Sequence, residues 1–170
     1  MTSADLLVDA YGRINEEVHQ VVDGLTLDQL ATRLDPDANS IGWLVWHLAR
    51  VQDDHVADAA RIDQVWTSQG WVDQFGLPFD PRAIGYGHSS DEVGAVRVAS
   101  GELLTGYHDA VHEQTVRYVE RLTDDDLPRI VDTRWDPPVT LAVRLVSVVS
   151  DCLQHAGQAA YVRGVLERTA

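Results

Sequence analysis

Three residues in two distant segments have the types and the spacing of a metal site. Asp151 and His155 stand four residues apart in a strongly apolar segment, and His47 lies about a hundred residues earlier. Positions i and i+4 of a helix share one face, with Cβ atoms roughly 5–6 Å apart, so this carboxylate and imidazole can converge on one cation. A third ligand from another helix would leave one tetrahedral corner open for water or substrate, as in catalytic zinc sites.

This layout resembles the DinB-like superfamily, four-helix bundles in which one His of the second helix and two residues of the fourth hold a divalent metal. The resemblance covers nearly the whole chain. It is closest to the branch that includes the metal-binding domain of mycothiol-dependent maleylpyruvate isomerase, where a carboxylate is followed four residues later by His. Carried over to this chain, the resemblance implies His47, Asp151 and His155 as the ligands. Many relatives have His at the position of Asp151, and the isomerase-like branch has Glu, which is one methylene longer.

Other histidines offer alternatives to this site. His108 and His112 are also spaced i and i+4, but His112 falls off the apolar stripe of its segment, so we interpret them as a surface pair. His55 lies two turns beyond His47 and is expected beside the ligands. Asp54, seven residues after His47, is a candidate acceptor for an imidazole N–H, because ligating histidines generally need one; the alternative is a surface carboxylate.

Cys152 and Arg144 on the Asp151 segment, and His88 in a loop, are the other residues that could contribute to this site. Cys152 turns toward the apolar stripe, so we expect a buried thiol that behaves as a small hydrophobe. Arg144 precedes Asp151 by seven residues and shares its face. It can orient the carboxylate, bind an anionic group of a cofactor or substrate, or form an exposed ion pair, and we take it as the candidate cofactor-binding residue. We interpret His88 as a residue without a special role, with the alternative that its Gly-containing segment reaches the site.

Apolar residues recur every three or four positions in four segments, which predicts four long amphipathic helices. They cover about residues 4–23, 41–62, 101–122 and 141–167. We therefore expect an all-α fold, an up-down-up-down four-helix bundle that forms a single domain over residues 1–170. Thr26 with Gln29 predicts a capped short turn of helix, Asn39 or Ser40 a cap for the second long helix, and Thr140 a cap for the fourth.

The segment 63–100 has no helical period and collects glycines, prolines and aromatic residues. Connections of this length are usually functional or contain small elements of their own, and residues 90–98 predict a short helix. The segment forms a long crossover between the second and third long helices, and we expect it to cover the open end of the bundle. Residues 129–139 predict an irregular or strand-like link.

Composition excludes several classes of function. The net charge of −14 argues against a nucleic-acid partner, because binding to its phosphates requires clustered basic residues. All 13 basic residues are Arg, so a Lys Schiff base is excluded. The single cysteine forms no internal disulfide, and the first residues lack the features of a signal peptide, so we expect a cytoplasmic protein. No apolar run approaches the roughly 20 residues of a membrane span.

Two imidazoles and one carboxylate suit zinc, with nickel, manganese or iron as further possibilities. The resemblance implies a thiol transferase or isomerase in which the metal activates a low-molecular-weight thiol such as mycothiol, which then attacks a small electrophile. Two alternatives stay open: a non-catalytic stress protein that binds a metal or a small ligand, and a metal-assisted hydrolase. A homodimer is expected, because relatives often pair and exposed Trp side chains suit an interface.

Overall fold

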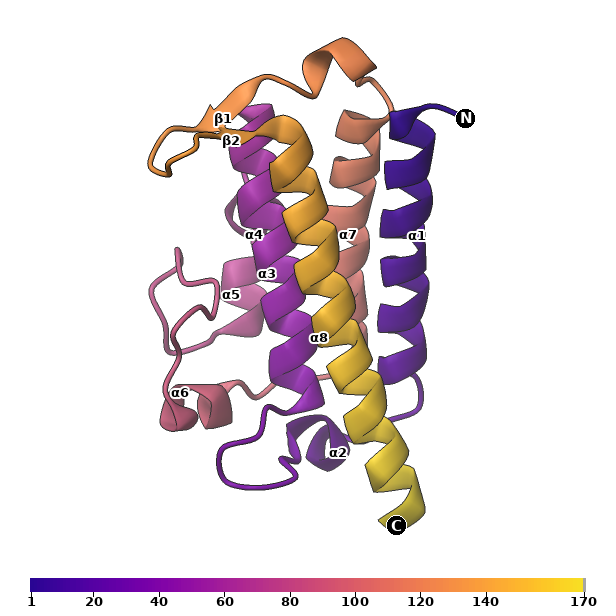
Figure 1. Cartoon of the computed structure of the whole chain (residues 1–170). Coiled ribbons are helices and arrows are strands. Elements are labelled where there is room, and N and C mark those ends of the chain that lie inside the picture. The colour runs from indigo at the N-terminus through magenta and orange to yellow at the C-terminus, as the bar shows by residue number, and fades with distance from the viewer. Residues whose placement is uncertain (170) are drawn as a thin grey trace.

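Four long helices make up most of residues 1–169, the part of the chain that the computed structural model describes (Figure 1). They are α1 (Ser3–Val22), α3 (Ile41–Ala60), α7 (Gly101–Val119) and α8 (Leu141–Thr169). The expectation of an all-α fold is confirmed, and the helices begin and end within three residues of the predicted bounds. The apolar stripes face one another, so that α3 packs on α7 and α8, and α1 packs on the same two helices.

The order of directions is not the one expected. Arg50 contacts Tyr107 and the Ala59 carbonyl accepts a hydrogen bond from Tyr118, so α3 and α7 run parallel. The Tyr11 hydroxyl donates to the carbonyl of Leu145 near the start of α8, while Arg163 near its end donates to the carbonyl of Gln20. Helices α1 and α8 are therefore parallel too. The four helices run up-down-down-up, and the prediction of an up-down-up-down order is wrong.

The reason for this order is the long connection between α3 and α7. It contains α4 (Val65–Ser68), α5 (Trp71–Phe75) and α6 (Ser90–Ala95) and runs back beside α3 to the end where α3 began (Figure 1). A helix of 20 residues is about 30 Å long, and this connection is long enough to span that distance. The crossover was expected, but it covers one side of the helices and not their open end.

Side-chain caps set where the site-bearing helices begin. Ser40 Oγ accepts from the backbone N–H of Trp43 at 3.1 Å, and Thr140 Oγ1 accepts from that of Val143 at 3.3 Å. Each cap satisfies an N–H group that a helix start leaves without a partner. The expected capping box of Thr26 and Gln29 also forms, at α2 (Leu27–Ala31). The first turns of α3 and α8 are thus placed by the residues that the sequence indicated.

Smaller elements close the two ends. A 3₁₀ turn (Asp124–Asp126) precedes two short antiparallel strands, β1 (Ile130–Asp132) and β2 (Val139–Thr140), which lie at the start of α8.

The core between the long helices is apolar and includes Trp46, Trp66 and Tyr107. Within residues 1–169, none of the helices combines the length and the apolar character needed to cross a membrane.

Candidate metal centre

The three residues singled out by spacing meet between α3 and α8. Because these helices are antiparallel, His47 in the second turn of α3 lies opposite His155 in the middle of α8, with ring centroids 4.7 Å apart. One ligand atom from each of His47, Asp151 and His155 lies within 4.8 Å of the other two. The Nε2 atom of His155 is 3.7 Å from Asp151 Oδ1. In the described part of the chain, this is the one group of three such side chains close enough to share a cation.

His47 is held in the state that a metal ligand needs. Its side chain is buried, and its Nδ1–H donates to the carbonyl of Ile84. A carbonyl only accepts, so the proton lies on Nδ1 and the Nε2 lone pair is free. Burial lowers the pKa of His47, outweighing the hydrogen bond to Ile84, so the ring is neutral at neutral pH. Asp54 is not the acceptor for His47, because Ile84 takes that proton; Asp54 accepts from Gln64 and lies 3.4 Å from Nδ1 of His55.

The two candidate ligands on α8 each have an atom free to bind a metal. Nδ1 of His155 lies 3.0 Å from the amide oxygen of Gln158, which leaves Nε2 for another partner. Oδ2 of Asp151 is buried and has no hydrogen-bond partner among residues 1–169. An unpaired buried carboxylate oxygen costs free energy unless a cation or water meets it. The donor set and this unpaired oxygen therefore fit a divalent metal.

A loop from the long connection packs directly on His47. Gly85 has a φ of +91°, and a Cβ atom added there would lie 2.6 Å from Nδ1 of His47. Only glycine allows both this conformation and this approach, which brings the carbonyl of Ile84 to the imidazole. The sequence showed a glycine here but nothing that linked it to His47.

We expect Gly85→Ala to destabilise the protein by more than Gly87→Ala. Gly87 also has a positive φ, +76°, but an added Cβ would meet nothing within 4 Å. Gly87→Ala should therefore cost only the backbone strain, about 1–2 kcal/mol, whereas Gly85→Ala adds the clash with His47. Denaturant unfolding of the two variants measures the difference. Equal losses would show that the loop moves away from His47 freely.

Trp43 joins the ligands to the loop. Its ring stacks on His47 at 4.5 Å between centroids and meets His155 edge-on at 6.1 Å. Its Nε1–H donates to Nδ1 of His88 at 3.3 Å, and His88 in turn stacks on Trp46. His88 thus lies beside the candidate site, which was the alternative to the favoured interpretation that it has no special role. Trp43 was missed, although its place four residues before His47 puts both on one face of α3.

Arg144 is engaged by neighbours other than Asp151. Its Nη2 donates to Asp132 at 2.8 Å, and its Nη1 lies 3.2 Å from Nδ1 of His55. Hydrogen bonds from Arg134, together with the charge of Arg144, hold the pKa of Asp132 well below its usual range. The sequence did not indicate Asp132, which reaches Arg144 only because β1 lies beside the first turns of α8. Cys152 is buried as expected, and burial raises the pKa of its thiol.

The alternative His pair lies elsewhere. His108 is fully buried on α7, where Nδ1 is 3.2 Å from the side-chain nitrogen of Asn15, and burial lowers its pKa to about 3. The interpretation of His108 and His112 as a surface pair is therefore wrong for His108. Neither joins a group of three candidate ligands within residues 1–169.

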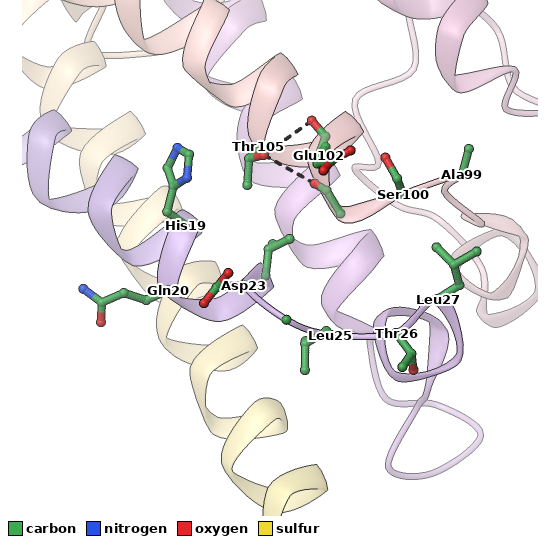
Figure 2. Close-up of a pocket in the computed structure, with 13 residues that line it drawn as sticks. His19, Gln20, Asp23, Leu25, Thr26, Leu27, Ala99, Ser100, Glu102 and Thr105 are labelled. Atoms are coloured by element: carbon green, nitrogen blue, oxygen red, sulfur yellow. Dashed lines mark hydrogen bonds between the residues drawn. The ribbon is translucent and has the colours of Figure 1, made fainter.

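Two hollows differ in their relation to the site. A hollow of about 710 Å³ lies between the end of α1 and the start of α7, and His19, Asp23 and Glu102 are among the residues that line it (Figure 2). A second hollow, of about 590 Å³, is bordered by His55 and Asp132, the two partners of Arg144. Neither hollow is lined by His47, Asp151 or His155, but the second is bordered by His55, which lies beside Arg144 of α8.

The helical fold places this chain among the DinB-like proteins, as the resemblance implied. The chain belongs to the mycothiol-S-transferase family, whose model matches residues 7–168. A solved structure, described as that of a conserved protein from Enterococcus faecalis, is similar over 96% of both chains, with 32% sequence identity and a TM-score of 0.90. Among curated proteins no match was found.

Proposed function

We propose that His47, Asp151 and His155 hold one divalent metal, with zinc as the first choice and nickel, manganese or iron as alternatives. The observation that carries the proposal is the buried, unpaired Oδ2 of Asp151 beside two imidazoles whose Nε2 atoms are free. Two nitrogens and one carboxylate oxygen are a common zinc donor set. Within the described residues no fourth His, Cys, Asp or Glu joins the group, which supports a position open to another ligand.

We further propose that the protein is a thiol-dependent transferase that joins mycothiol, or a related low-molecular-weight thiol, to a small electrophile. The family supports both the thiol and the transfer reaction. When bound, the metal supplies a Lewis acid that lowers the pKa of a coordinated thiol. An isomerase that uses the same activated thiol is a second candidate, since both reactions begin with attack of the thiol on the electrophile.

The chain's own residues would orient the reactants. The Ile84 carbonyl and Gln158 fix the two imidazoles, and Trp43 excludes water from one face of His47. The hollow beside His55 and Asp132 has room for the rest of the thiol molecule. Arg144 would act there by holding these two residues in place, since its guanidinium is already paired with Asp132.

A stress protein and a hydrolase are the two alternatives to the transferase. A non-catalytic metal- or ligand-binding stress protein would be supported by a metal that stays bound without any thiol-dependent reaction. A metal-assisted hydrolase would turn over without thiol.

We propose that residues 1–170 form one domain, because the core is continuous through all four long helices. We also propose a homodimer, although Trp135 alone of the five Trp side chains is exposed, and Trp43, Trp46 and Trp66 are buried.

We expect conjugation of an electrophile to require both a metal and a low-molecular-weight thiol. Zinc-loaded protein with mycothiol and a chromogenic electrophile should show turnover that a chelator abolishes and added zinc restores. Cys152→Ser should keep most of this activity, because the Cys152 thiol is fully buried and its raised pKa keeps it protonated. Turnover that persists after chelation, or water-dependent hydrolysis without thiol, would contradict the transferase proposal.

A further inference from the structure

One face of α8 carries the candidate metal centre between two ends of different character. Arg144, Asp151, His155 and Gln158 follow one another at intervals of seven, four and three residues, which keeps their side chains on one side of the helix. Helix α3 runs antiparallel along this side, and its His55 meets Arg144 at one end. With a rise of about 1.5 Å per residue, Gln158 lies about 4.5 Å along the axis from His155, and Arg144 about 10 Å from Asp151. The Gln158 end is therefore the nearer one to the candidate ligands.

A third hollow lies at the Gln158 end. It has a volume of about 560 Å³ and is enclosed by α8, the first turn of α3 and the loop that precedes α3. We call it the α8 hollow. Gln158 is part of its lining, and the amide oxygen of Gln158 accepts from Nδ1 of His155 at 3.0 Å. The NH2 group of the same amide can donate to an acceptor on a bound molecule. A molecule in the α8 hollow would thus lie one side chain away from a candidate ligand.

The lining of the α8 hollow is mostly apolar. Small-molecule sites of about 300–1,000 Å³ combine apolar and aromatic walls with a few polar groups, and this hollow has both the size and the composition. Three of its polar groups are amides, from Asn39, Gln154 and Gln158. The ring of Tyr161 is 66% exposed and can stack on an aromatic molecule. The apolar residues of the lining are Leu34, Ala38, Leu44, Gly157 and Val162.

Charge restricts what the α8 hollow can bind. Among residues 1–169, Asp37 is the one charged residue of its lining, neither Arg nor His lines it, and the chain has no Lys. A carboxylate on a ligand would find no cation there and would meet the negative field of a chain with a net charge of −14. The hollow beside His55 differs, because Asp54, Asp58 and Arg134 border it, and an apolar molecule would bury these charges without pairing them. The two hollows therefore suit molecules of different character.

We propose that the α8 hollow binds the electrophile of the transfer reaction, and that this electrophile is a neutral, apolar molecule with an aromatic ring. The inference rests on the proposed function, in which the rest of the thiol molecule takes the hollow beside His55. The electrophile then approaches the candidate centre from the opposite end of the same helix face. With chlorodinitrobenzene as the electrophile, the thiol sulfur bonds to the ring carbon, chloride leaves with the electron pair of the broken bond, and the thiol proton passes to the buffer.

Binding of dinitrobenzene, which has no leaving group, tests the hollow without any turnover. Gly157→Leu fills part of the hollow, and an added Cβ atom there meets nothing within 4 Å, so the helix can accept the side chain. We expect calorimetry to show binding at least roughly tenfold weaker than in the unmodified protein. Tyr161→Ala, which removes an exposed ring, should weaken binding too. Gly12→Leu makes the same change as Gly157→Leu at an equally unhindered glycine of α1, outside the hollow, and should leave binding unchanged.

Dinitrobenzoate tests the charge of the ligand. It differs from dinitrobenzene by one carboxylate, for which the lining of the α8 hollow offers no cation. Its binding to the unmodified protein should therefore be at least roughly tenfold weaker. Equal or tighter binding of dinitrobenzoate would overturn the assignment of a neutral electrophile. Dinitrobenzene binding that survives both Gly157→Leu and Tyr161→Ala would place the ligand elsewhere and overturn the site.

Steady-state kinetics with mycothiol and chlorodinitrobenzene links the hollow to the reaction. Gly157→Leu should raise the KM for chlorodinitrobenzene roughly tenfold with little change in kcat, as loss of ground-state binding does. The KM for mycothiol and the zinc content should stay those of the unmodified protein, because the thiol molecule would bind at the other end of the face. A rise in the KM for mycothiol alone would assign the hollow to the thiol and contradict the inference. If dinitrobenzene binds as expected but no thiol supports turnover, the binding site is confirmed while the transferase proposal fails.

Discussion

His155→Ala is expected to release the bound metal from the purified protein while the helical fold is retained. The substitution removes one of the three proposed ligands from a position where 18% of the side chain is exposed. The loss of affinity should exceed the roughly 10–100-fold that removal of an outer hydrogen-bond partner costs. Elemental analysis after dialysis, followed by zinc titration against a competing chelator, measures it.

Graded and control variants sharpen this test. Asp151→Asn keeps the shape of the side chain but removes its charge, so it should weaken zinc binding without changing the circular dichroism spectrum. His112→Ala, on α7, should leave affinity unchanged, because His112 belongs to no group of three ligands in the described chain. If His47→Ala and His155→Ala both retain a full complement of metal, the site lies elsewhere and the assignment fails.

Asp53→Ala is expected to lower the free energy of unfolding by about 3–5 kcal/mol, as removal of one partner of a buried ion pair does. Asp53 is fully enclosed, and its carboxylate accepts from the backbone N–H groups of Val65 and Trp66, each at 2.8 Å. It also accepts from the Tyr107 hydroxyl at 2.9 Å. The substitution leaves all these donors, and the buried charge of Arg50, without their acceptor.

The same carboxylate holds the long connection in place. Val65 and Trp66 are the first residues of α4, and the residue before them makes no side-chain cap, so Asp53 of α3 satisfies this helix start. Asp58→Ala is the matched control, because Asp58 is exposed on the same helix and a surface change of this kind stays within about 0.5 kcal/mol. Urea unfolding followed by Trp fluorescence compares the midpoints. A loss for Asp53→Ala no larger than that for Asp58→Ala would show that the network contributes little.

Local patterns in the sequence predicted much of the fold and the main features of the site. Apolar periodicity located the four long helices, and Ser40 and Thr140 were recognised as their caps, because both signals act within a few residues of chain. Spacing on one helix paired Asp151 with His155, His47 was the candidate third ligand from another helix, and the family resemblance implied the same three residues. These three residues could be identified because a metal site needs ligand atoms on particular helix faces, and the spacing of residues in the sequence shows which side chains share a face.

Only the tertiary structure decided how the segments meet. The parallel course of α3 and α7 depends on the path of the long connection, which no local period records. The acceptor for His47 is the backbone carbonyl of Ile84, and because every residue has such a carbonyl, the type of residue did not indicate it. Arg144 pairs with Asp132 through the position of β1. His108 is buried because α1 packs over it. Sequence spacing determines which side chains share a face of one helix, but packing determines what that face meets.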